Sequence, residues 1–271
     1  MVKMIVTDLD GTLLSSGQQV SDKDYATLIE IGLQGIIRVI ATGRSPYSFQ
    51  KVIPDDFPID YLVFSSGAGI MDYHTKEILF ARNLPEDLVH RIAGQLRDLE
   101  VPFKVLAPVP ENHHYVYFQN GDLHPDFIRR METYRGFERP ISFDPPNFGE
   151  ACQFLIILPP DPVHFELLKS RFPDVKVIRA TSPIDHKSIW MEIYDREVSK
   201  GNAVGFLSDK HGFSRSEVMG VGNDYNDFDL LAFTGQSFVV SNAPEELLAI
   251  YPAVRSNDES GFTDSVTRAL A

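Results

Sequence analysis

The stretch Asp8-Leu9-Asp10-Gly11-Thr12-Leu13-Leu14 follows the apolar run Met4-Ile5-Val6 and decides the fold of this chain. A near-continuous apolar run is typical of a parallel strand that is buried on both faces. Side chains alternate along an extended backbone, so Asp8 and Asp10 can project to the same side just beyond the strand. Ligands of open α/β sheets bind beyond the carboxyl ends of strands, so the sequence predicts a site at this pair.

Two carboxyl groups held this close together repel each other, which raises the pKa of one of them unless a cation neutralises the pair. The pair therefore favours a hard divalent metal ion with oxygen ligands. The alternative is that Asp-Leu-Asp-Gly-Thr is simply a turn, because Asp and Gly are common in turns. Its place directly after an N-terminal strand, and three further polar segments in the chain, favour the site.

The composition indicates an ordinary globular protein with one large domain or two smaller ones. The chain has 271 residues, of which 43% are hydrophobic and 23% are charged. Its net charge of -13 argues against a nucleic-acid partner or an anionic membrane surface, since both select for clustered Lys and Arg. The apolar run before Asp8 is too short for a signal peptide, and no segment reaches the ~20 apolar residues of a membrane span. We therefore expect a cytoplasmic protein without a membrane or nucleic-acid partner.

The first eighty residues alternate between strand and helix signals. Strands are predicted at 3–7, 36–41 and 61–65, helices at 22–34 and 46–53, and a hairpin at 68–73 and 77–81. Alternation of this kind is typical of right-handed βαβ units and a parallel sheet. The same rhythm returns late in the chain, with strands near 189–194, 218–221 and 237–240 and helices at 200–210 and 227–232.

The segment between them, residues 83–188, has a different composition and is rich in Pro, His and aromatic residues. Strands are predicted there at 101–106, 114–118, 151–158 and 175–179, with helices at 85–99, 125–134 and 162–171. The expected fold is α/β, with a Rossmann-like doubly wound parallel sheet as its core and an inserted α+β cap domain. The expected limits are 1–82 and 189–271 for the core and 83–188 for the insert, which would lie above the Asp8 site.

Two further segments offer partners for a phosphoryl group. Thr42-Gly43-Arg44 follows the strand at 36–41 and places a hydroxyl and a guanidinium at a second strand end. As an alternative, this tripeptide is a helix cap and loop. Lys200 opens a predicted helix after the N-cap Ser199, where the helix dipole disfavours a cation. Nearby carboxylates would explain its position, although most lysines are simply solvated surface residues.

A third segment, Gly222-Asn223-Asp224-Tyr225-Asn226-Asp227, again follows an apolar strand and opens a helix. Gly222 permits a close approach of the backbone, and the Asn and Asp side chains offer oxygen ligands and polar contacts. An acidic helix cap is the alternative here. Three sets of oxygen donors at three parallel strand ends favour one shared site.

With these segments in place, the chain resembles the haloacid dehalogenase superfamily of phosphohydrolases, and most closely its Cof-type branch of sugar-phosphate phosphatases with a large α/β cap. Asp8 and Asp10 match the D-x-D-G-T motif of that family, Thr42 matches its second-strand Ser/Thr, and Lys200 matches its third-motif lysine. The match covers the whole length of the chain in motif order.

Two positions depart from the family pattern. The segment 222–227 matches the G-D-x-x-N-D metal motif, but Asn223 stands where the family usually has its first metal-binding Asp. An amide oxygen can coordinate magnesium but carries no charge, so weaker binding is expected unless Asp224 compensates. Ser66-Gly67 stands where the family usually has Asn-Gly after the third strand.

The resemblance implies an Mg²⁺-dependent phosphomonoester hydrolase that acts on a small phosphorylated metabolite, such as a sugar phosphate, through an aspartyl-phosphate. Asp8 would be the nucleophile, Asp10 the general acid and base, and Lys200 the charge that stabilises both. Expected metal ligands are Asp8, the Asp10 carbonyl, Asn223, Asp224 and Asp227. Expected substrate contacts are Thr42, Gly43, Arg44 and Asn226. A phosphomutase, or a non-enzymatic phospho-acceptor with regulatory function, would use the same residues and stays an alternative.

By analogy with capped relatives, specificity would lie in the insert, which offers few clear candidates. His113-His114-Tyr115-Val116-Tyr117 alternates as a strand and would place His114 opposite Tyr115. A histidine on a strand is more often a surface or hydrogen-bonded core residue than a ligand, so the pattern does not predict a metal site there.

Overall fold

The computed structural model describes residues 1–182 and 184–271, and the chain divides into two compact units. The first unit contains Met1–Phe80 and Ser199–Ala271, and the second contains Ala81–Val198. None of the helices in the described residues has the length and apolar character that crossing a bilayer requires.

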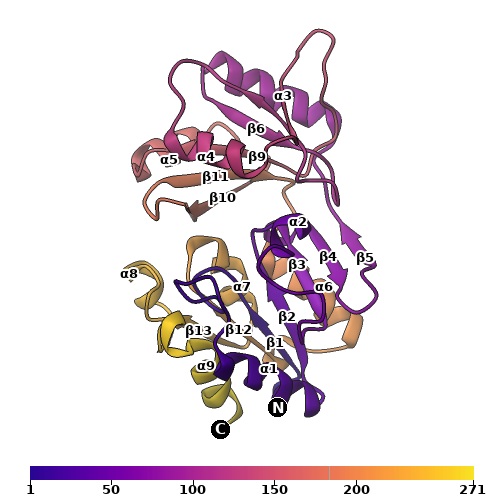
Figure 1. Cartoon of the computed structure of the whole chain (residues 1–271), viewed down its shortest axis with the longest axis vertical. Helices are drawn as coiled ribbons and strands as arrows, with labels where there is room; N and C mark the ends of the chain where they lie inside the picture. The colour runs from indigo at the N-terminus through magenta and orange to yellow at the C-terminus, as the bar shows by residue number, and fades with distance from the viewer. Residues whose placement is uncertain (183) are drawn as a thin grey trace. The chain divides into compact units, whose positions relative to one another are not determined.

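The first unit is built on an eight-stranded sheet with the order β14-β13-β12-β1-β2-β3-β4-β5 (Figure 1). The six strands from β14 to β3 run parallel, and β4 is antiparallel to β3. The strand bounds are β1 Met4–Thr7, β2 Ile37–Ala41, β3 Tyr61–Phe64, β4 Gly69–Asp72, β5 Ile78–Ala81, β12 Val218–Gly222, β13 Gln236–Val240 and β14 Ala253–Val254. The central strand β1 is buried throughout, as its apolar sequence predicts.

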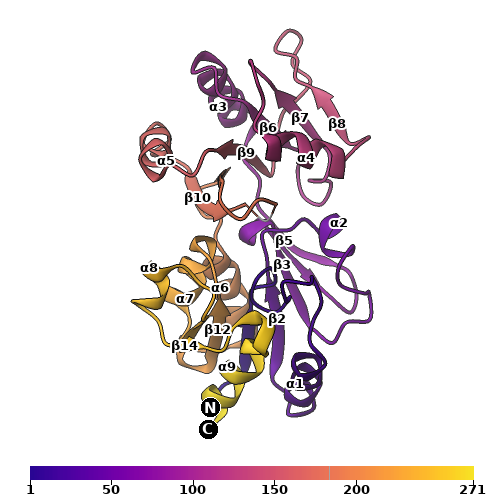
Figure 2. The same cartoon turned by 60° about the vertical axis from the view of Figure 1, so that its left-hand side comes forward.

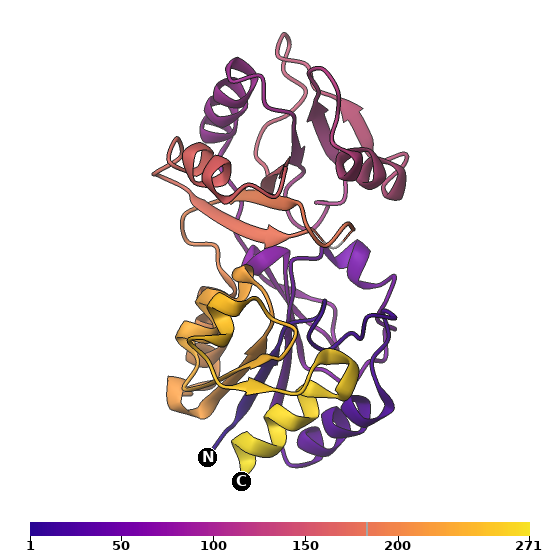
Figure 3. The same cartoon turned by 90° about the vertical axis from the view of Figure 1, so that its left-hand side faces the viewer.

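Helices cover both faces of this sheet. Their bounds are α1 Asp22–Leu33, α2 Pro46–Phe49, α6 Lys200–His211, α7 Phe228–Phe233, α8 Glu245–Leu248 and α9 Gly261–Leu270. Buried residues of α6 and α7 share one hydrophobic cluster with β1, β2 and β3. Helices α1 and α9 lie side by side (Figure 3), where Asp24 of α1 accepts hydrogen bonds from the amide and hydroxyl of Thr263 of α9. The doubly wound core predicted from the sequence is therefore confirmed.

Helix ends follow the capping signals in the sequence. Ser21 accepts a hydrogen bond from the amide of Asp24 and caps α1, and Ser199 accepts one from the amide of Asn202 and caps α6. Helix α6 ends at His211, and Gly212, which follows it, has a φ of 67°, the left-handed conformation that favours glycine. These caps fix where α6 begins and so place Lys200 in its first turn.

The second unit is a six-stranded sheet with the order β10-β11-β9-β6-β7-β8 (Figure 2), antiparallel except for the pair β7 and β8. Its strands are β6 Phe103–Leu106, β7 Tyr115–Phe118, β8 Glu138–Pro140, β9 Gln153–Leu158, β10 Lys176–Thr181 and β11 Ile189–Tyr194. Its helices are α3 Glu86–Asp98, α4 Pro125–Thr133 and α5 Pro162–Lys169. Apolar residues of α3 and α5 share one core cluster with alternate residues of β6, β9 and β11.

The sequence places the strand Ile189–Tyr194 with the core, and this assignment is wrong. The structure pairs it with β9 and β10 in the second sheet, and the chain returns to the first unit only at Ser199. All six residues of the strand are buried, so the same sequence pattern is expected whether the strand lies in the first or the second sheet. Its antiparallel pairing with β10, the strand before it in the chain, is what places it in the second sheet and not in the first.

The elements β8, α8, β14 and the final helix α9 lie outside the sequence prediction. Helix α9 is ten residues long and amphipathic, so the sequence did hold a signal for it. Strand β8 is three residues long and β14 is two, which is too short for any periodicity to be recognised. Helix α2 ends at Phe49, four residues earlier than the sequence predicts.

Candidate active site

Four segments that are far apart in the sequence meet at one edge of the first sheet. In the strand order β12-β1-β2, the central strand β1 leads into Asp8, β2 leads into Thr42, and β12 leads into Asn223. The first turn of α6 adds Lys200, which packs beside them. The carboxyl ends of adjacent parallel strands form the expected place for a ligand site in such a sheet.

Lys200 is the electrostatic centre of this site. Its ammonium group is fully buried and lies 2.6 Å from Asp8 Oδ1 and 2.5 Å from Asp227 Oδ1. The side chain of Asp8 is 6% exposed and that of Asp227 is 0% exposed, so solvent screens these ion pairs little. The cation at a helix start is thus held by two carboxylates, as its unfavourable position in the helix dipole predicts.

Burial and mutual charge shift the pKa values of Asp8 and Lys200. Burial raises the pKa of the Asp8 carboxyl to about 8, and the carboxylates of Asp227 and Asp10 act in the same direction, while Lys200 opposes them. Burial lowers the pKa of Lys200, but Asp227 and Asp8 outweigh this effect and leave the pKa above its usual value. One buried cation therefore does not fully compensate the carboxylates, and a further positive charge beside Asp8 would favour its ionised form.

Asp227 connects the loop after β12 to Lys200. While its Oδ1 contacts Lys200, its Oδ2 accepts hydrogen bonds from the backbone amides of Asn223 at 2.8 Å and Asp224 at 3.1 Å. A methyl group on Gly222 would lie 2.6 Å from this carboxylate, which is too close for any other residue. Asp227 thus ties the loop after β12 to Lys200, with both of its oxygens engaged.

Asn223 places one end of its side-chain amide beside Thr12, Asp8 and Asp10. Thr12 Oγ1 donates to Asn223 Oδ1 at 3.1 Å. The same end of the Asn223 amide lies 3.1 Å from Asp8 Oδ2 and 3.0 Å from the carbonyl oxygen of Asp10. When the amide is turned by half a rotation, its NH₂ group donates to all three of these partners instead.

The distances from the Asn223 amide to the Asp8 and Asp10 oxygens match those between neighbouring ligands of a magnesium ion. Oxygen ligands about 2.1 Å from Mg²⁺ in an octahedron lie about 3.0 Å from one another. The amide oxygen in this place would repel Asp8 Oδ2 and the Asp10 carbonyl unless a cation lay between them, whereas the amide NH₂ would hold them together without one. The NH₂ group facing these oxygens thus satisfies their hydrogen bonds without a cation. Asp8 Oδ2 and the Asp10 carbonyl are oxygen ligands that fit a hard divalent cation, and Asn223 would join them as a neutral ligand with its amide oxygen turned toward the ion.

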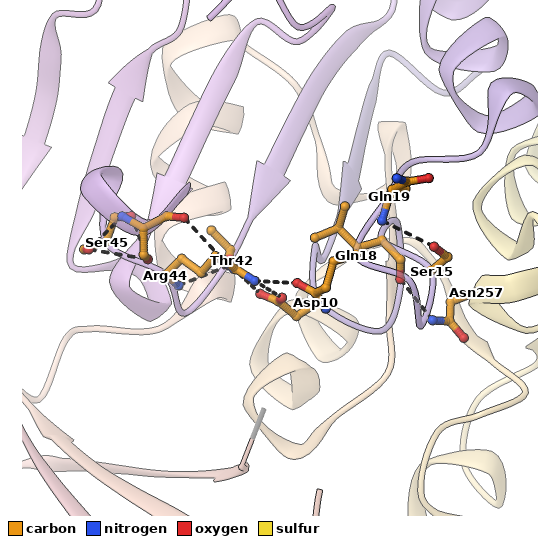
Figure 4. A network of polar contacts seen from close by, with 10 residues as sticks. Asp10, Ser15, Gln18, Gln19, Thr42, Arg44, Ser45 and Asn257 are labelled. Carbon is orange, nitrogen blue, oxygen red and sulfur yellow. Dashed lines mark hydrogen bonds and ion pairs between the residues drawn. The ribbon is translucent and has the colours of Figure 1, made fainter. Parts of the chain in front are cut away.

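Asp10 is held by Arg44 in a two-pronged ion pair. Arg44 Nε donates to Asp10 Oδ2 at 2.8 Å, and its terminal nitrogen donates to Asp10 Oδ1 at 2.6 Å (Figure 4). The guanidinium also donates to Gln18 Oε1 at 2.8 Å and to the Ser48 carbonyl at 3.2 Å. A fork of this kind fixes the orientation of a carboxylate as well as its charge. The sequence assigns Arg44 to the substrate, but in the structure its guanidinium contacts Asp10.

Polar groups also gather around Gly43, next to the buried side chain of Thr42. A methyl group on Gly43 would lie 3.6 Å from Ser66 Oγ and 3.7 Å from Asn226 Nδ2. Thr42 Oγ1 accepts a hydrogen bond from the Arg44 amide at 3.1 Å and can donate its own proton elsewhere. Hydroxyl and amide groups from the loops after β2, β3 and β12 thus lie around Gly43.

Gly67 brings the loop after β3 against the start of α6. Its φ is 102°, and a methyl group there would lie 2.2 Å from the carbonyl oxygen of Ser199. Ser66, just before it, has a φ of 56° and donates its amide to the Thr42 carbonyl. The loop that departs from the family pattern is therefore tightly bound to both the Lys200 helix and the Thr42 strand end.

The sequence assigns no role to Gln18 or Thr12, although both contact site residues in the structure. Thr12 belongs to the quoted D-x-D-G-T stretch, so its contact with Asn223 had a signal in the motif. Gln18 lies eight residues beyond Asp10 in a polar loop, and no spacing rule relates it to Arg44. Its contact follows only from how that loop folds.

Comparisons with known proteins identify the family of this chain. The sequence model of the haloacid dehalogenase-like hydrolases matches residues 5–266. A protein of Haemophilus influenzae named "Putative phosphatase" is 27% identical over 97% of this chain and 96% of its own length. The phosphatase YwpJ of Bacillus subtilis is 25% identical over 99% of this chain and 100% of its own.

Solved structures share the fold at lower identity. A phosphatase of the haloalkanoate superfamily from Bacteroides thetaiotaomicron, BT1666, superposes with a TM-score of 0.81 at 20% identity, covering 99% of this chain and 95% of its own. The subclass IIB sugar phosphatase BT4131 superposes with a TM-score of 0.78 at 18% identity, covering 98% of each chain. These likenesses establish the fold. Because the family match spans nearly the whole chain and includes every segment of the site, the chain belongs to the haloacid dehalogenase-like hydrolases.

Proposed function

We propose that this hydrolase is an Mg²⁺-dependent phosphatase that releases phosphate from a small phosphorylated metabolite, such as a sugar phosphate, in the cytoplasm. The observation that carries the proposal is the placement of the Asp8 carboxylate. Its Oδ1 accepts a hydrogen bond from the buried Lys200, and its Oδ2 lies 3.1 Å from the side-chain amide of Asn223. With magnesium bound, this carboxylate would lie between two positive charges and would be kept ionised and oriented for attack on phosphorus.

Asp8 Oδ2, the Asp10 carbonyl and Asn223 Oδ1 would hold the magnesium ion. When bound, it would screen the negative charge of Asp8 from that of the phosphate. Asp227 would support this set from behind through Lys200 and the backbone amides of the loop, and would not be a direct ligand. This arrangement gives Asn223 the ligand role that the family pattern assigns to an Asp.

The reaction would proceed in two displacements. A carboxylate oxygen of Asp8 would attack phosphorus and form an aspartyl-phosphate, while Asp10 would protonate the departing alkoxide. Asp10 would then take a proton from a water molecule, whose oxygen would attack phosphorus and release inorganic phosphate and Asp8. Thr42 and Asn226 would donate hydrogen bonds to phosphoryl oxygens around Gly43, and Lys200 would stabilise the charge that develops.

The experiment is a phosphate-release assay on the purified protein with a panel of sugar phosphates, nucleotides and an aryl phosphate. We expect continuous release with Mg²⁺ and loss of release after chelation. Isomerisation of a sugar phosphate that requires a bisphosphate would indicate a phosphomutase instead. A single stoichiometric phosphorylation by acetyl phosphate without further turnover would indicate a phospho-acceptor and would contradict the proposal.

Replacing Asn223 tests its role as a neutral magnesium ligand. We expect Asn223→Asp to lower the Mg²⁺ concentration needed for half-maximal activity by about tenfold, because a second charged ligand beside Asp8 binds the cation more strongly. Without metal, the same variant should have a lower melting temperature than the wild type, because it adds a carboxylate beside Asp8. A magnesium titration of activity and a melting curve in chelator measure the two effects. Asn120→Asp, which adds the same charge on an exposed loop of the second unit, is the control and should change neither.

The second prediction concerns Arg44 as a positioning residue. We expect Arg44→Lys to lower kcat by roughly 10²-fold, because lysine cannot reproduce the fork that orients Asp10. Asp10→Asn should lower kcat by ~10²–10⁴-fold. The double variant should be about as active as Asp10→Asn alone, because the two residues act as a unit.

The matched control is Arg38→Lys. Arg38 forms a similar two-pronged ion pair with Asp60, with distances of 3.0 and 2.8 Å, and the two pairs are similarly exposed. Its pair lies near the start of β2, whereas Arg44 follows the end of that strand. If Arg38→Lys and Arg44→Lys reduced kcat equally, or if the Arg44 and Asp10 effects simply multiplied, the positioning role would be wrong.

A further inference from the structure

A cluster of two histidines and a glutamate lies in the second unit, in the loop between β6 and β7. The ligand atoms of Glu111, His113 and His114 all lie within 4.8 Å of one another. This is the one group of three or more His, Cys, Asp or Glu residues with such spacing found across residues 1–182 and 184–271. None of these three residues has a place in the mechanism proposed above.

A tight turn gathers the three side chains. The amide of His114 donates to the carbonyl of Glu111 at 2.9 Å, and the amide of Ala107 donates to the carbonyl of His114 at 2.9 Å. Strand β7 therefore begins at Tyr115, one residue later than the sequence pattern predicts. Because His113 and His114 belong to the turn, strand alternation does not separate them, and their ring centroids lie 4.4 Å apart.

Both imidazoles present the same nitrogen to one oxygen. His113 Nε2 lies 3.6 Å from Glu111 Oε2, and His114 Nε2 lies 3.8 Å from the same oxygen. Ligands about 2.0–2.1 Å from a tetrahedral zinc ion lie about 3.3 Å from one another, so only small side-chain rotations separate this arrangement from a coordinated one. Each ring also packs edge-on against Phe137, with centroid distances of 4.8 Å, which limits the freedom of both rings.

The exposure of the cluster suits an ion that enters from solvent. The side chain of His113 is 16% exposed, while those of His114 and Glu111 are 49% and 66% exposed. Burial lowers the pKa of His113, and the adjacent His114 acts in the same direction against the opposing Glu111. The lowered pKa favours the neutral form of His113, which is the form in which an imidazole binds a metal.

We propose that Glu111, His113 and His114 form a binding site for a divalent transition metal ion such as Zn²⁺, with water completing the coordination shell. Two imidazole nitrogens and one carboxylate oxygen favour Zn²⁺, Ni²⁺, Co²⁺ or Cu²⁺ over Mg²⁺. The Asp8 site offers oxygen atoms alone and favours Mg²⁺. The chain would thus hold two metal sites with opposite selectivity, one in each unit.

The test is a titration of the full-length protein with Zn²⁺ in saturating Mg²⁺, followed by calorimetry, with Co²⁺ absorption in the visible range as a second readout. We expect one Zn²⁺ per chain in the presence of Mg²⁺. His113→Ala and His114→Ala should each weaken binding by at least ~10-fold, since even loss of a residue that only supports a ligand costs this much. Binding should also weaken as the pH falls through the histidine range, because protons compete with the metal.

Two controls separate this site from others. His164→Ala removes an exposed histidine of α5 and should leave Zn²⁺ binding unchanged. Asp8→Asn alters the magnesium site and should also leave Zn²⁺ binding unchanged, so the outcome does not depend on the proposed phosphatase activity. No Zn²⁺ binding in excess Mg²⁺, or binding that persists in the His113→Ala/His114→Ala double variant, would overturn the proposal.

Discussion

Asp8→Asn is expected to abolish phosphate release while the protein remains folded. An amide cannot attack phosphorus, and loss of a nucleophile of this kind lowers kcat by roughly 10⁴–10⁶-fold. The fold should persist because Lys200 keeps its ion pair with Asp227 at 2.5 Å, and because burial already disfavours the charge of Asp8. Initial rates on an aryl phosphate with Mg²⁺, together with a melting curve, measure both parts of the result.

Asp56→Asn is the matched control, since it makes the same chemical change on an exposed loop of the same unit. It should keep the activity of the wild type. An acid-quenched reaction with labelled substrate adds a direct readout: the wild type should retain label on the protein, and Asp8→Asn should not. Near-normal turnover by Asp8→Asn, or an equal amount of label on the variant, would rule out Asp8 as the nucleophile.

Lys200→Met is expected to remove activity and also to destabilise the fold in the absence of metal. The substitution leaves two buried carboxylates, Asp8 and Asp227, without their shared cation. Breaking a buried ion pair by removing one partner costs about 3–5 kcal/mol of unfolding free energy. Mg²⁺ should recover part of this loss, because it neutralises Asp8. Denaturant unfolding with and without Mg²⁺ measures the change.

Two further variants test the electrostatic reason. Adding Asp227→Asn to Lys200→Met removes one of the uncompensated charges, so it should restore part of the stability but not the activity. Lys104→Met is the matched control, because Lys104 is also fully buried but donates to the carbonyl of Phe127, and burial lowers its pKa to about 6. It should cost far less stability than Lys200→Met. Equal losses in the two lysine variants would indicate lost packing and not lost charge compensation.

The sequence predicted the core of the fold well because its signals there are local. Strand β1 is an uninterrupted apolar run, and the helices α1 and α6 begin at serine caps that the structure confirms. The strand Ile189–Tyr194 went to the wrong sheet because burial on both faces gives the same apolar pattern in either unit. Pairing between strands is a contact between distant segments, which periodicity does not record.

The sequence alone determined which residues reach the strand ends and hence the chemistry they offer. Asp8, Thr42, Lys200 and Asp227 stand directly after a strand or at the start of a helix, positions that local signals fix. Only the tertiary structure decided how they pair: Asp227 binds Lys200 and the loop amides, Arg44 forms an ion pair with Asp10, and the side-chain amide of Asn223 contacts Asp8 and the Asp10 carbonyl. The physical reason is that the direction of a side chain beyond a strand end depends on how the loops pack, and hydrogen bonds and charges over about 3 Å depend on that direction.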